Sequence, residues 1–101
     1  MVSVFIVDPK RPTRTIKEVK AEIVTRKFSW ADVNGKRHLI GSSAFFSLAA
    51  AKRAKLGYLM KVVEGPGRSY VAWHFPEFYA EAKKQVKNWK SKYDGGVRHS
   101  P

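Results

Sequence analysis

Residues 28–40, FSWADVNGKRHLI, decide the fold class of this chain. Within them, Asn34-Gly35 is the strongest short signal for a β-hairpin, because both central residues of the mirror-image turn need positive φ. The turn joins a strand expected over 28–33 to a strand expected over 36–40. The stretch therefore predicts two antiparallel strands in direct contact.

Two further strands are predicted upstream. Residues 2–7 form a nearly continuous β-branched and aromatic run that ends at an Asp-Pro pair, which is typical of a buried strand. In residues 16–26, Val19, Ala21 and Ile23 alternate with charged neighbours, which is the pattern of a half-buried strand. The segment between the two strands holds two prolines and three cations without an apolar period, so we expect an exposed arm there.

A helix and a second hairpin are predicted next. The helix is expected to begin at 41–43, where serines can accept from free backbone N–H groups, and to run to about Leu56, with Gly57 ending it. Residues 58–63 and 69–73 are predicted as two strands, because they are rich in β-branched and aromatic residues around a Gly-Pro-Gly turn.

The last helix has the clearest periodicity. Pro76 is expected to open it, and Asp94 with the following glycines to end it. Its apolar residues recur at spacings of three and four and form one stripe: Phe78, Ala82, Val86, Trp89 and Tyr93.

These elements predict an α+β fold, a small mainly antiparallel sheet of four to five strands with two helices packed against it. Residues 1–94 are expected to form a single compact domain, and 95–101 a flexible C-terminal tail.

Net charge is the strongest functional signal. Twenty lysines and arginines stand against eight aspartates and glutamates in 101 residues, which leaves a formal charge of +12. Such an excess predicts a polyanionic partner, and nucleic acid is the first candidate because phosphate neutralisation releases condensed counterions.

Four lysines of the last helix are the first candidate contacts. Lys83, Lys87 and Lys90 follow at i, i+4 and i+7, so they project from one side, with Lys84 at its edge. A solvated helix face also explains lysines here, but such a face usually mixes both signs, and no acid follows Glu81 until Asp94.

Further candidates lie elsewhere in the chain. Cations of the first hairpin and of the arm are expected to contact phosphates, and Trp30 to stack on a base, although core packing is the plainer explanation of a tryptophan. Cations at the end of the first helix suit its dipole equally well. The residues concerned are Lys36, Arg37, Arg11, Arg14, Trp30, Lys52, Arg53 and Lys55.

Several classes of function are not expected. Without cysteine there are no disulfides or thiolate ligands, and His38, His74 and His99 have no spacing typical of a metal site. We expect no cofactor, no metal and no enzymatic activity. No apolar run approaches the length of a membrane span, so no membrane partner is expected, and a cytoplasmic location is compatible with the composition.

Two hypotheses about function remain. In the first, the protein is a small basic module that binds DNA or RNA through the phosphate backbone, with little sequence specificity and without catalysis. In the second, it is a regulator or inhibitor, of the kind that phages and mobile elements encode, whose basic face docks on an acidic protein such as a nucleic-acid-processing enzyme. Oligomeric state does not follow from the sequence.

Overall fold

The computed structural model describes residues 1–97, with side chains described up to Ser91. Two compact units divide the chain, one formed by Met1–Lys55 and one that begins at Leu56. We call them the sheet unit and the helical unit. The α+β class is confirmed, with an antiparallel five-stranded sheet and with three helices rather than the two that were predicted. The prediction of one domain over 1–94 stays a prediction.

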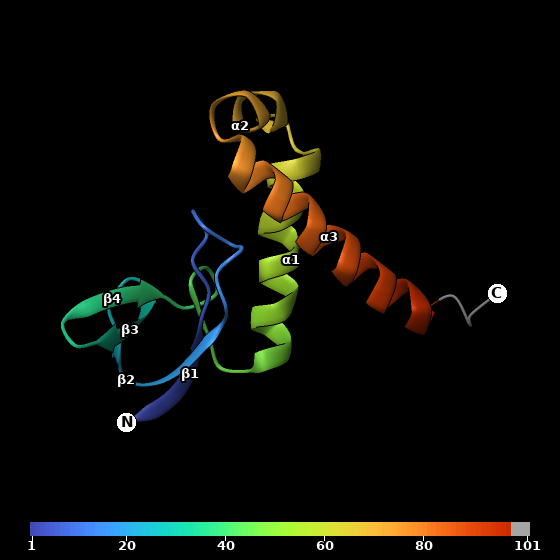
Figure 1. Cartoon of the computed structure of the whole chain (residues 1–101). Coiled ribbons are helices and arrows are strands. Elements are labelled where there is room, and N and C mark those ends of the chain that lie inside the picture. Colours follow the sequence, from blue (N-terminus) through green and yellow to red (C-terminus); the bar gives the residue numbers. More distant parts are fainter. Residues whose placement is uncertain (98–101) are drawn as a thin grey trace. The chain divides into compact units, whose positions relative to one another are not determined.

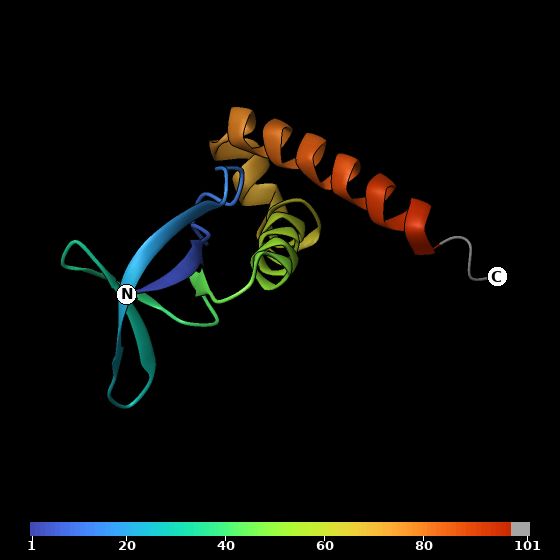
Figure 2. The same ribbon diagram turned by 90° about the horizontal axis from the view of Figure 1, so that it is seen from below.

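The sheet unit contains a curled sheet in which the first four strands follow one another as a meander (Figures 1 and 2). The spatial order is β4-β3-β2-β1-β5, and every strand pairing is antiparallel. The strands are β1 (Val2–Ile6), β2 (Lys17–Thr25), β3 (Ser29–Val33), β4 (Lys36–Leu39) and β5 (Ala44–Phe45).

The predicted hairpin of β3 and β4 is confirmed. Asn34 and Gly35 have φ values of 53° and 83°, the left-handed conformation that the mirror-image turn needs. The Asp32 carboxylate also accepts a hydrogen bond from the Gly35 N–H at 2.9 Å. The turn thus sets the register in which Val33 faces Lys36.

One face of the sheet, which we call the inner face, carries the core of this unit. Its fully buried side chains are Val4, Ala21, Ala31 and Ala44. Three of these are alanines, so small side chains make up most of the fully buried part of this face. The other side of the strands, the outer face, carries Phe5, Val24, Trp30 and Leu39, in keeping with the period-2 alternation of side chains.

The predicted start of the first helix at 41–43 is wrong. These residues form a tight turn, with Gly41 at φ 93°, and Ala44–Phe45 then add β5 to the edge of β1. Helix α1 (Leu48–Glu64) begins later, and the Ser47 hydroxyl caps it by accepting from the Ala50 N–H at 3.2 Å.

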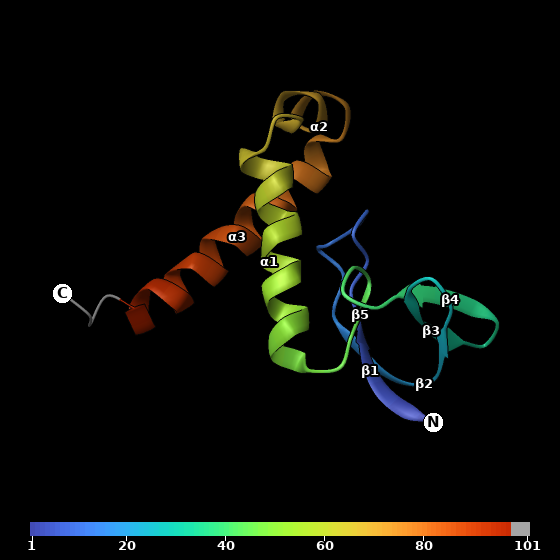
Figure 3. The same ribbon diagram turned by 180° about the vertical axis from the view of Figure 1, so that it is seen from behind.

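The predicted second hairpin is also wrong, because its two strands are helices. Helix α1 continues through Gly57 to Glu64, and α2 spans Arg68–His74 (Figure 3). In the helical unit, Leu59 and Val63 lie one turn apart and pack with Ala82 and Val86 in a buried cluster. This packing outweighs the strand propensity of residues 58–63 and the helix-weakening effect of one glycine.

Helix α1 ends where Gly65 is required, because a Cβ at this position would clash with the carbonyl oxygen of Lys61. Helix α3 (Pro76–Val97) opens at the predicted proline and packs against α2. It continues past Asp94, so its predicted end was too early, and the rest of the predicted tail, 98–101, lies outside the described residues. Within 1–97, none of the helices combines the length and apolar character of a membrane span.

Candidate nucleic-acid interface

A groove of about 690 Å³ lies in the sheet unit, at the end of the sheet where β2 and β4 begin. Since β3 is antiparallel to both, β2 and β4 run in the same direction, and the first residue of each strand, Lys17 and Lys36, lines the groove. The arm between β1 and β2 lines the same groove. We call it the cationic groove because of its basic lining residues, which are Lys10, Arg11, Arg14, Lys17 and Lys36.

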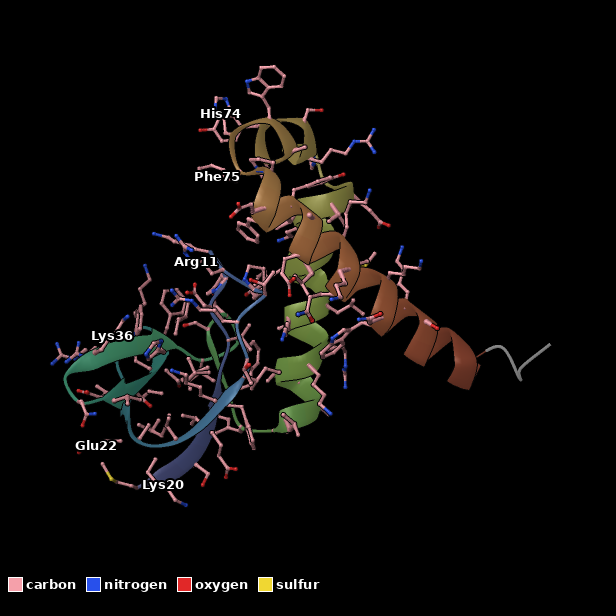
Figure 4. The ribbon with its side chains drawn as sticks, viewed as in Figure 1. Arg11, Lys20, Glu22, Lys36, His74 and Phe75 are labelled. Carbon is pink, nitrogen blue, oxygen red and sulfur yellow. The ribbon has the colours of Figure 1, made fainter. Side chains whose placement is uncertain are left out.

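Alternation along the strands decides which cations reach this groove. Lys36 pairs with Val33 and Lys17 with Ile6, so both lysines lie on the inner face. The next residue, Arg37, pairs with Asp32 on the outer face. The predicted joint contact by Lys36 and Arg37 is therefore divided between two faces, and Figure 4 labels Lys36 on β4 and Arg11 on the arm.

Acidic side chains are segregated from the groove by the same alternation. All three carboxylates of the strands, those of Glu18, Glu22 and Asp32, lie on the outer face. There they share the surface with cations such as Lys20, whose ammonium donates to the Ser3 hydroxyl at 2.6 Å. Every residue of the five strands is described, and the inner face holds positive charge without a strand carboxylate.

Asp8 is the one acid among the lining residues of the groove, all of which are described. Its Oδ1 accepts from the backbone N–H groups of Lys10 and Arg11 at 3.0 and 3.2 Å, and its Oδ2 lies 3.5 Å from Arg14 Nη1. The carboxylate thus holds the arm in a turn, and Pro12 anchors the arm as one of the most buried side chains. Most of the positive charge of the groove is left uncompensated.

His38 lies in the groove two residues after Lys36. Burial lowers its pKa below the ordinary 6.5, the Lys36 charge lowers it further, and Asp8 acts in the opposite direction. The imidazole is therefore mainly neutral at pH 7 and offers one hydrogen-bond donor and one acceptor.

The helical unit carries the predicted lysines of α3, which we call the α3 row: Lys83, Lys84, Lys87 and Lys90. They line an open groove of about 710 Å³ beside Val63 and Val86. The prediction that no acid compensates these lysines is wrong for Lys90, whose ammonium lies 2.6 Å from the carboxylate of Glu64 in α1. Lys83 lies 5.7 Å from the ring centre of Tyr79.

The remaining predicted residues lie elsewhere. Lys55 is only 7% exposed and burial lowers its pKa, so it is unsuited to a surface contact, while Lys52 is half-buried and Arg53 exposed. Trp30 is half-buried on the outer face opposite Val24, away from the cationic groove.

Among the basic residues of the groove, Lys17 was missed at the level of sequence, whereas Lys10 belongs to the arm and His38 to the hairpin that were expected to contact phosphates. A signal existed for Lys17, which shares the alternation of Val19 and Ala21 and so belongs to the inner face.

In the helical unit, Trp73 of α2 is 80% exposed, and the Tyr70 and His74 rings lie 4.3 Å apart. No group of three or more His, Asp or Glu side chains suited to a metal ion occurs among the described residues.

Comparison of this chain with protein-family models, with curated proteins and with solved structures finds no match.

Proposed function

We propose that this protein binds nucleic acid without catalysis, by neutralising backbone phosphates in the cationic groove and along the α3 row. The observation that supports this most is the composition of the groove. Five cations from the arm, β2 and β4 line it, and the one carboxylate among them is already engaged by the arm.

Like charges in a concave site repel one another and reinforce a common field, so the groove favours an anion that enters it. A nucleic-acid strand supplies several phosphates in succession and gains entropy from released counterions. The same cations carry little information about base sequence, since phosphate contacts position a strand and do not read it. Weak sequence specificity is therefore part of the proposal.

The direct test measures binding of labelled DNA and RNA oligonucleotides by fluorescence anisotropy at increasing salt. If about six phosphates of a duplex are neutralised, log affinity should fall against log salt with a slope near −5, or near −4 for a single strand. A slope near zero, or no binding of either polymer at about 50 mM salt, contradicts the proposal.

Lys36 and Arg37 provide a matched pair for the site, because the two cations are adjacent in sequence and lie on opposite faces. Lys36→Glu should weaken binding by about ten- to a hundredfold, because a charged hydrogen bond is lost and a repulsion is added. Arg37→Glu makes the same change in net charge and should weaken binding by about threefold or less. Equal effects of the two substitutions contradict a contact in the groove.

Docking on an acidic protein is the competing outcome. An acidic protein that the immobilised chain recovers from nuclease-treated extract, in the absence of direct nucleic-acid binding, supports this alternative. Loss of all partners on nuclease treatment supports the proposal.

A further inference from the structure

Phosphate contacts leave one part of the cationic groove unexplained, which is its apolar floor. Ile6, Val19 and Val33 line the groove and also pack against the buried core of the sheet unit. All three lie on the inner face and are half-buried. The groove is therefore the open end of the core, and a bare phosphate chain would leave this floor in contact with water.

Its volume is that of a site for a small ligand. A volume of about 690 Å³ lies within the range of 300–1,000 Å³ that is typical of such sites. Small-ligand sites combine apolar side chains, which supply affinity, with polar groups, which supply orientation, and both kinds of side chain line this groove.

Two lysines of the groove are direct cross-strand neighbours of the apolar residues on its floor. Lys17 is the cross-strand partner of Ile6, and Lys36 is the partner of Val33. Directly opposed residues of an antiparallel pair have Cβ atoms about 4.5–5.5 Å apart. A nucleotide has a matching structure, since one sugar separates its flat, weakly polar base from its charged phosphate.

His38 adds a ring at the edge of the floor, since it lies on the inner face opposite Ala31. A neutral imidazole can stack on a base or form a hydrogen bond with its edge. Bases inside a duplex keep their faces stacked on one another, so only an unpaired base can offer a face to this surface.

We infer that the cationic groove holds an unpaired nucleotide, with its base on Ile6, Val19 and Val33 and its phosphates beside Lys17 and Lys36. The inference rests on the proposed function and makes it more specific: the partner is single-stranded DNA or RNA. Duplex ends and loops qualify only where their bases are unpaired.

The test compares three ligands of equal length: a single strand, the same strand with abasic sites, and a duplex. The single strand should bind about five- to a hundredfold more tightly than the abasic strand, by analogy with the contribution of one base stacked on an aromatic side chain. It should also bind more tightly than the duplex.

Val33→Thr and Val24→Thr form the matched pair of variants. Each puts a hydroxyl in place of a methyl group at nearly constant shape, on the inner face for Val33 and on the outer face for Val24. Val33→Thr should weaken binding of the normal strand and leave the abasic strand unchanged, while Val24→Thr should leave both unchanged.

A second measurement needs no variant. In NMR titrations of the unsubstituted protein, adenosine monophosphate should shift the signals of His38, Val19 and Val33, and ribose 5-phosphate should shift them much less.

The outcomes separate this inference from the proposed function. Equal binding of normal and abasic strands with a steep salt dependence, or tighter binding of the duplex, overturns the inference and leaves phosphate binding intact. Absence of binding to every ligand at low salt overturns both. Equal shifts of the three signals by the two small ligands also overturn the inference.

Discussion

The cationic groove and the α3 row carry charge of the same sign but are built in different ways. The α3 row comes from one helix, whose repeat places residues three and four apart side by side. The groove draws its cations from the arm and from two strands that are not neighbours in the sheet. The sheet unit also has the larger excess, with twelve lysines and arginines against four acids, compared with eight against four from Leu56 onward.

If the proposed function is correct, we expect a convergence of separate segments to be a better indicator of a binding site than a periodic run of lysines. The α3 row lies on an open helix surface, and Lys90 is already paired with Glu64. In the groove the one lining carboxylate holds the arm instead of neutralising the lysines of the strands. A concave wall also focuses the field of its charges more than an exposed helix does.

The largest effect should come from removing the support of the α3 row. Leu59 is fully buried in the cluster with Val63, Ala82 and Val86, so Leu59→Ala should lower the free energy of unfolding by about 2–5 kcal/mol. Thermal unfolding followed by circular dichroism measures the change. Below the new midpoint, binding of a single strand should persist, because the groove residues lie in the other unit.

Leu48→Ala is the control for this prediction. It makes the same truncation in α1, but Leu48 is 42% exposed and outside the buried cluster, so the loss should stay below about 1 kcal/mol. Loss of strand binding in a folded Leu59→Ala protein would make the helical unit, and not the groove, the main site.

A smaller effect is expected from reversing charge in the α3 row itself. The double variant Lys84→Glu, Lys87→Glu should weaken binding by about tenfold and reduce the magnitude of the salt slope by about two, as two phosphate contacts are lost. Anisotropy titrations at several salt concentrations measure both quantities. Lys20→Glu, on the outer face, serves as control. A loss larger than that from Lys36→Glu would reverse the ranking of the two surfaces.

The smallest effect concerns pH and His38. Because its pKa is lowered in the folded protein, the unfolded chain binds more protons below pH 6.5, and stability should fall as pH drops from 6.5 through the lowered pKa. A phosphate bound in the groove stabilises the protonated imidazole of His38. Strand affinity should therefore rise by about two- to fivefold as the pH falls from about 7.5 to about 5.5.

His38→Gln should abolish this rise in affinity, and His74→Gln in the helical unit should preserve it. The measurement is anisotropy at constant ionic strength across this pH range. An unchanged pH profile in His38→Gln would exclude phosphate binding beside the imidazole.

Predictions from sequence succeeded where a local signal was sufficient. The Asn34-Gly35 turn, the alternation of Val19, Ala21 and Ile23, and the proline at the start of α3 each depend on residues close together in the chain. They failed at 58–63, where apolar residues fit both a strand and a helix until Leu59 and Val63 meet α3.

Sequence by itself therefore determined the excess of positive charge, the antiparallel hairpin and the lysine face of α3, because composition, turn geometry and helical repeat are local properties. Only the tertiary structure decided that Lys36 lines a groove while Arg37 does not, and that Arg11, Lys17 and Lys36 share it. The physical reason is that strand pairing brings together residues distant in sequence, and the pleat then sends each side chain to one face or the other.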